Sequence, residues 1–117
     1  MNWQDSIIFL GAEDLEKVDE FYGNFLGLSL FKDQGLCRIY DIPGGGKIGF
    51  CSHMEKNTGD KSPIITLLTE EVDSVYQDSK NKGLEIVKNP AENKRFNIYH
   101  FFMKDPEGYC VEVQKFL

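Results

Sequence analysis

The chain has 117 residues, which is the size of one domain or of two small halves that share a core. Hydrophobic residues make up 41% of it and charged residues 27%, so the composition excludes a disordered or collagen-like chain. The formal net charge of −6 disfavours nucleic acid and anionic membranes as partners, because both repel an acidic surface.

The first half of the chain predicts a strand, a helix and three further strands. Residues 6–10 form a short apolar run typical of a strand. Asp14 is a suitable N-cap for a helix, and Gly27 ends that helix because glycine accepts positive φ. The apolar stripe of this helix consists of Leu15, Val18, Phe21, Tyr22 and Phe25. The three strands that follow are predicted at residues 28–32, 36–42 and 47–52.

The second half repeats this order after a polar stretch. Residues 53–62 lack hydrophobic periodicity, so we interpret them as a linker. A strand is predicted at residues 63–68, followed by a helix that Thr69 caps and Gly83 ends. Residues 84–88 predict a strand, residues 89–94 a polar loop, and residues 99–114 a hairpin.

The turn of this hairpin has the sequence Asp105-Pro106-Glu107-Gly108. Asp suits the first turn position, Pro presets φ at the second, and Gly accepts the positive φ of a bulged three-residue loop. This geometry predicts that Phe102 lies opposite Glu112 and that His100 lies opposite Gln114. Alternation then places these four side chains on one face of the sheet, with an almost wholly apolar set on the other. The apolar face is predicted to carry a helix or another layer.

The repeat of strand, helix and three strands predicts the fold class, because internal repeats of this kind pack side by side. We expect an α+β domain over residues 1–117, built from two βαβββ modules that form a curved mixed sheet. The modules cover about residues 5–53 and 63–117, joined by the linker at about 53–62. The helices are expected on the outer face, and an open cup inside.

The cellular compartment is predicted from three features that the sequence lacks. The longest apolar runs, residues 7–10 and 64–68, are too short to span a bilayer. The N-terminal sequence MNWQDS lacks the basic and apolar regions of a signal peptide. Cys37, Cys51 and Cys110 are an odd set without CxxC spacing, which favours reduced thiols. We therefore predict a cytoplasmic protein.

Two segments resemble the vicinal oxygen chelate superfamily, which includes glyoxalase I, extradiol dioxygenases and fosfomycin- and bleomycin-resistance proteins. Residues 14–28, DLEKVDEFYGNFLGL, resemble its first module, and residues 102–113, FMKDPEGYCVEV, resemble the signature of its second. Together they extend the resemblance over essentially the whole chain. The resemblance implies the paired-module cup, often within a homodimer.

The same resemblance locates four positions where metal-dependent members carry ligands. Three of them fall on Ile7, on or beside Gly49, and near Pro63 or Ile64, none of which has a side-chain lone pair to donate. Only Glu112 retains a residue able to bind a metal. Because a catalytic divalent site needs about three protein ligands, we expect no metal and no other cofactor there. A relocated site from His100, Glu112 and Cys51 is the alternative.

The leading functional hypothesis is metal-independent binding or sequestration of a small hydrophobic or aromatic molecule, similar to bleomycin-resistance proteins. The alternative is a glyoxalase-like lyase or isomerase, or a dioxygenase, with a relocated metal site, and a third hypothesis is an interaction module without a ligand. The expected lining of the cup is Ile7, Phe9, Gly49, Cys51, His100, Phe102 and Glu112. Further candidates for walls that stack on a planar ligand are Trp3, Phe31 and Phe96.

One strand leaves two alternatives open. Arg38 and Tyr40 alternate with Cys37 and Ile39 along residues 36–42, so only one of these pairs faces the cup. An inward Arg38 would favour an anionic ligand and would be able to pair with Glu112.

Overall fold

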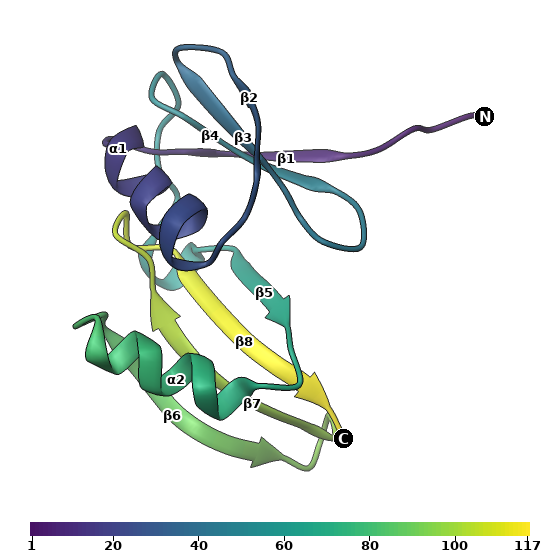
Figure 1. Cartoon of the computed structure of the whole chain (residues 1–117), viewed down its shortest axis with the longest axis vertical. Helices are drawn as coiled ribbons and strands as arrows, with labels where there is room; N and C mark the ends of the chain where they lie inside the picture. The colour runs from purple at the N-terminus through teal and green to yellow at the C-terminus, as the bar shows by residue number, and fades with distance from the viewer. The chain divides into compact units, whose positions relative to one another are not determined.

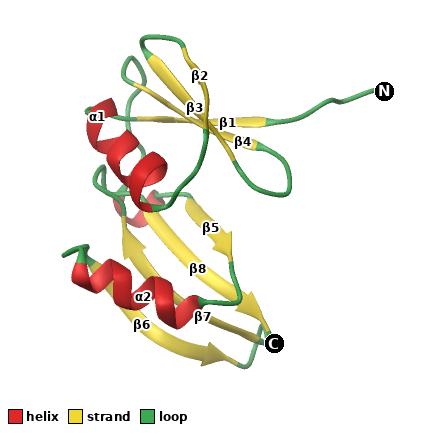
Figure 2. Cartoon of the chain, in the orientation of Figure 1, coloured by secondary structure: helices red, strands yellow, loops and turns green.

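A computed structural model describes all residues from 1 to 117. The chain divides into two compact units, Met1–Asn57 and Thr58–Leu117. The first unit carries one helical segment, and the second carries an α-helix (Val72–Asn81) and a short 3-10 helix (Gly59–Lys61). Each unit has its own four-stranded mixed sheet (Figure 2). The prediction of an α+β fold with two βαβββ modules is therefore confirmed.

The sheet of the first unit has the strand order β1-β4-β3-β2 (Figure 1). Its strands are β1 (Ile7–Gly11), β2 (Leu30–Asp33), β3 (Cys37–Asp41) and β4 (Lys47–Cys51). β1 pairs with β4 in parallel, and the other neighbours are antiparallel. The parallel pair is possible because the helical segment carries the chain back across the sheet after β1.

The helix of the first unit begins as expected, but it does not continue as an α-helix. Asp14 is the N-cap, and its carboxylate accepts the backbone N–H groups of Glu16 and Lys17. Only α1 (Leu15–Val18) is α-helical, and Asp19–Phe25 forms a π-helix. The segment ends at Gly27 with φ of 76°, as the sequence predicted.

The core of this unit lies between the helical segment and one face of the sheet. Tyr22 and Phe50 are fully buried, with ring centroids 4.6 Å apart. The hydroxyl of Tyr40 donates to the Asp19 carboxylate at 2.7 Å, and burial together with that acceptor raises the pKa of Tyr40. Arg38 also faces the helix, since it binds the Glu16 carboxylate at 2.7 Å.

These contacts settle the alternatives for β3. Arg38 and Tyr40 lie on the helix side, so alternation places Cys37 and Ile39 on the other face. Arg38 is engaged within its own unit by Glu16 and Asp33.

The sheet of the second unit has the equivalent order, β5-β8-β7-β6. Its strands are β5 (Ile64–Leu68), β6 (Ile86–Asn93), β7 (Ile98–Lys104) and β8 (Cys110–Phe116). Helix α2 (Val72–Asn81) lies against one face of this sheet (Figure 1). Tyr76 on this helix packs edge-on against Phe101, with ring centroids 5.4 Å apart. The apolar face of the terminal hairpin therefore carries a helix, as predicted.

The hairpin register is also confirmed. Phe102 lies opposite Glu112, and His100 lies opposite Gln114. The turn is fixed by Asp105, whose buried carboxylate accepts the N–H of Glu107 at 2.9 Å and of Tyr109 at 2.8 Å. The turn residues thus set which side chains share a face of this sheet.

Two predictions for the second unit are wrong in detail. β6 continues to Asn93, through most of the segment expected to be a loop. Its pairing with β7 shifts twice, between Ile86 and Lys88 and between Lys88 and Ala91, and these irregularities accommodate Pro90, which has no N–H to donate. Thr69 is not the helix cap, because its hydroxyl accepts the N–H of Glu71 before α2 begins.

The cysteines also differ from expectation. Cys37 and Cys51 form a disulfide, so the prediction of three reduced thiols is wrong. The two residues lie directly opposite on neighbouring strands, with Cα atoms 4.1 Å apart, which brings their side chains together. Cys110 is the free cysteine. None of the helices has the length and apolar character needed to cross a membrane.

Candidate ligand-binding pocket of the second unit

The second unit contains an open pocket of about 560 Å³ on the face of its sheet that α2 does not cover. The lining residues, which come from all four strands and the β6–β7 turn, are Ile64, Lys88, Asn93, Phe96, Ile98, His100, Phe102, Glu112, Gln114 and Phe116. The volume is within the range of small-molecule sites, and most of the wall is apolar. The hairpin register explains why the even-numbered residues of β7 and β8 gather here.

A buried carboxylate forms the polar centre of this pocket. Glu112 is only 9% exposed, and both of its oxygens have partners. Oε1 accepts the hydroxyl of Thr66 at 2.7 Å, and Oε2 lies 2.6 Å from Nδ1 of His100. Thr66 lies opposite Glu112 on the parallel strand β5, so the sheet itself aligns this network. A buried carboxylate is costly without partners, and these two contacts offset that cost.

The contact with Glu112 fixes the orientation of the His100 ring. A carboxylate only accepts, so Nδ1 of His100 is the nitrogen that carries the proton. In the neutral ring, Nε2 is then a hydrogen-bond acceptor on a residue that lines the pocket. His100 can therefore receive a hydrogen bond, or a proton, from a bound molecule.

Three phenylalanines and His100 give the walls of the pocket their aromatic surface. Phe102 packs edge-on against His100, with ring centroids 5.0 Å apart, and the ammonium of Lys88 lies 5.9 Å from its ring centroid. Phe96 and Phe116 are 62% and 65% exposed. Large apolar side chains left this open at the rim of a concave site are typical of a surface that binds a partner molecule.

The predicted site residues fall into two sets. His100, Phe102 and Glu112 come together in the pocket, and Phe96, a predicted wall residue, joins them. Ile7, Phe9, Gly49 and Cys51 alternate along β1 and β4 on one face of the sheet in the first unit. A cup that unites both sets stays a prediction.

The four predicted residues in the first unit do not form an open surface for a ligand. The ring of Phe9 covers Gly49, since a Cβ added to Gly49 would meet two ring carbons at 2.6 Å. Cys51 is 1% exposed and bonded to Cys37, so it has no thiol to offer a ligand. The relocated metal site of His100, Glu112 and Cys51 is therefore not available with this disulfide formed.

Sequence reasoning missed several residues of the pocket region, and Thr66, Lys88 and Phe116 show why. The position of Thr66 opposite Glu112 could not be predicted, because the register of the parallel pair β5–β8 is not set by any turn. Lys88 was predicted to lie in a strand, but the side of the sheet on which it lies was not predicted, because bulges interrupt the alternation of side chains along β6. Phe116 follows the predicted end of the hairpin, and continued alternation from Glu112 and Gln114 was the signal that would have found it.

The positions where metal-dependent members of the resembled superfamily carry ligands do not supply a set of metal donors in this chain. Ile64 begins β5 and lines the pocket with a hydrocarbon side chain, and Ile7 and Gly49 likewise lack lone pairs. Glu112 is held by Thr66 and His100. The residues at these positions do not fit a divalent ion with three protein ligands.

Comparison with known proteins agrees with this architecture. The profile of the Glyoxalase/Bleomycin resistance protein/Dioxygenase superfamily matches residues 5–113. The chain belongs to this superfamily. No curated protein matches the chain.

Several solved structures share the fold. A superfamily member from Sphaerobacter thermophilus is 20% identical with a TM-score of 0.79, over 97% of this chain and 98% of that one. A glyoxalase/dioxygenase from Nostoc punctiforme is 15% identical with a TM-score of 0.80, over 97% and 91% of the two chains. A virulence protein from Salmonella typhimurium is 20% identical with a TM-score of 0.72, over 100% and 98%. These likenesses concern the fold, and the activity of the chain has to be argued from its own residues.

Proposed function

We propose that the protein binds a small, partly aromatic molecule in the pocket of the second unit, without a metal and without chemical conversion. The observation that supports this proposal is an open pocket of about 560 Å³ with three phenylalanines in its walls, around His100 and Glu112, which are hydrogen-bonded to each other. Binding of this kind needs only apolar walls and a few fixed polar groups, and both are present.

The polar groups indicate what the ligand offers. In the neutral ring, Nε2 of His100 is an acceptor, so a hydrogen-bond donor such as a phenol or an amide N–H suits it. A flat apolar portion would pack against Phe96 and Phe102. Lys88 and Glu112 are the oppositely charged groups of the lining, so a ligand of small net charge fits better than a polyanion.

One specific observation favours a second candidate function, an enzyme of the lyase or isomerase class. A carboxylate that holds Nδ1–H of a histidine leaves Nε2 able to take a proton, which is the arrangement of a general base. The reaction class would be proton removal from a carbon or a hydroxyl group of the bound molecule. This candidate predicts turnover, whereas the binding proposal predicts recovery of the ligand unchanged.

The test is a ligand panel on protein freed of affinity tag and dialysed against a chelator. Aromatic metabolites and antibiotics are screened by thermal shift, because a ligand that binds only the folded state raises the melting temperature. For the best compound, we expect His100→Gln and Phe102→Ala each to weaken binding roughly tenfold, as loss of one hydrogen bond or one aromatic wall implies. Tyr99→Phe is the matched control, since Tyr99 lies on the same strand and its hydroxyl is occupied by Asp73.

The outcomes separate the candidates. Chelator-treated protein that binds a compound, returns it unchanged and loses affinity in the two pocket variants supports sequestration. Conversion of the compound that disappears in His100→Gln supports the enzyme. A broad panel without any shift, or binding that is equal in all three variants, would contradict the proposed site.

A further inference from the structure

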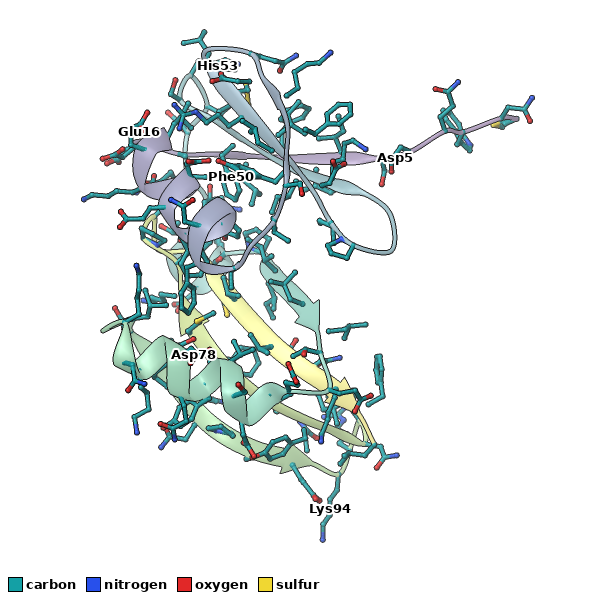
Figure 3. All side chains as sticks on the ribbon, in the orientation of Figure 1. Asp5, Glu16, Phe50, His53, Asp78 and Lys94 are labelled. Atoms are coloured by element: carbon teal, nitrogen blue, oxygen red, sulfur yellow. A yellow bond between two sulfur atoms is a disulfide. The ribbon has the colours of Figure 1, made fainter.

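A second cluster of chemically capable side chains lies in the first unit. Cys37 on β3 and Cys51 at the end of β4 face each other across the strand pair, and His53 follows two residues later. One ligand atom from each of these three residues lies within 4.8 Å of the others. His53 is labelled in Figure 3. None of these residues lines the pocket described above.

The donor set of this cluster is specific in its chemistry. Two thiolates and one imidazole are soft and borderline ligands, which suit Zn²⁺ and not Mg²⁺ or Ca²⁺. Tetrahedral Zn²⁺ with these ligands requires donor atoms roughly 3.5–3.8 Å apart, given the usual Zn–S and Zn–N bond lengths. The three donors lie within 4.8 Å of one another, and once the disulfide is reduced, rotation of the two cysteine side chains would part the sulfurs to this spacing.

We propose that the reduced protein binds one zinc ion through Cys37, Cys51 and His53, and that disulfide formation releases it. A dithiol reductant transfers two electrons and two protons to the disulfide, so the Sγ–Sγ bond breaks and the reductant itself becomes a disulfide. Zn²⁺ then displaces both thiol protons and forms two Zn–S bonds and one Zn–N bond, with water in the fourth position. Oxidation of the thiolates by a second disulfide re-forms the bond between the cysteines and expels the ion.

The position of the cluster is compatible with this exchange. Cys37 is 8% exposed and Cys51 1% exposed, so the sulfurs lie under the surface, whereas His53 is exposed. The exposed imidazole is the group that an incoming ion would meet first. The antiparallel pairing of β3 with β4 keeps the two sulfurs adjacent, so the dithiol would be preorganised when the disulfide is open.

The experiment uses the full chain without an affinity tag, in oxidised and reduced forms. The reduced form is prepared with a dithiol, which is removed by gel filtration without oxygen before Zn²⁺ is added. After a wash with a weak chelator, we expect about one zinc per reduced chain by elemental analysis and almost none on the oxidised chain. Co²⁺ in place of Zn²⁺ gives an independent readout, because thiolate-bound tetrahedral cobalt absorbs visible light.

Variants distinguish this site from thiol binding elsewhere. Cys110→Ser is the matched control and should keep full binding, because Cys110 is the free cysteine of the second unit. His53→Ala is an exposed change that should preserve folding and weaken zinc binding roughly tenfold or more, since even outer partners of a metal site contribute that much. Cys37→Ser should abolish binding.

Four results would overturn the proposal: no zinc on reduced protein, equal zinc on both redox forms, unchanged affinity in His53→Ala, or loss of zinc in Cys110→Ser. Should Cys37→Ser fail to fold by circular dichroism, the comparison of redox forms and the His53→Ala affinity still decide the question.

Discussion

The disulfide of the first unit makes a quantitative prediction about stability. Cys37 and Cys51 are 14 positions apart, so their bond closes a short loop in the unfolded chain. The chain-entropy relation for a loop of this length gives about 3 kcal/mol at 25 °C in favour of the folded state. Reduction without zinc should therefore lower the free energy of unfolding by about 3 kcal/mol.

Urea unfolding is the assay, with chelator present and far-ultraviolet circular dichroism as the signal. For a typical urea dependence, a loss of that size moves the midpoint by about 1–3 M. If the two units unfold in separate steps, the step that unfolds the first unit, which holds the disulfide, should carry the shift.

Two control variants test whether the effect comes from this disulfide. Cys37→Ala with Cys51→Ala should unfold near the midpoint of the reduced protein and should not respond to reductant. Cys110→Ser should respond as the natural chain does, since Cys110 is not in the disulfide. Equal midpoints for the oxidised and reduced chains, or a reductant response that persists without Cys37 and Cys51, would refute the loop-closure reasoning.

Three further predictions concern single residues. Gly49→Ala should lower stability by about 1–3 kcal/mol, because its Cβ would meet the Phe9 ring, and Phe9→Ala in the same chain should relieve much of the loss in a double-mutant cycle measured in urea. Asp105→Ala should cost about 2–4 kcal/mol in the same assay, since it removes the carboxylate that accepts two buried backbone N–H groups, and an unchanged midpoint would contradict the role given to this turn. Burial, together with the Glu112 charge, raises the pKa of the Cys110 thiol, so iodoacetamide should modify it more slowly than free cysteine at pH 8, with the rate rising only at higher pH; a rate equal to that of free cysteine would contradict this environment.

The terminal hairpin was predictable because its information is local. Asp105, Pro106 and Gly108 each fit one position of one turn type, and the turn sets the register of both strands. Once the register is fixed, alternation alone places His100 and Glu112 on one face. The polar centre of the pocket could therefore be inferred from the amino-acid sequence alone.

Two other features were not predictable in the same way. The apolar stripe of the first helix fits both α- and π-helical turns, and hydrogen bonds such as that from the N–H of Leu26 to the carbonyl of Phe21 mark the wider turn. The strand after Ile86 was obscured by Pro90, because proline usually interrupts a strand and is tolerated only at an edge or a bulge.

The disulfide did leave a signal. Cys37 and Cys51 are equally far from Gly44, in the loop that joins β3 and β4, so a symmetric hairpin places them opposite each other. The odd number of cysteines drew attention away from this pairing. Local symmetry about a glycine-rich loop was better evidence here than the total count.

The two sheets share a strand order, and the registers of their parallel strand pairs, β1 with β4 and β5 with β8, match position by position. Gly49 lies between Phe9 and β3 in the first unit, and Glu112 lies between Thr66 and β7 in the second. At this equivalent position of the two sheets, the first unit has a glycine that an aromatic ring covers, and the second has a carboxylate. Under the proposed binding function, ligand preference can change through the second copy while the first remains filled, so directed evolution toward a new ligand should begin with residues around Glu112.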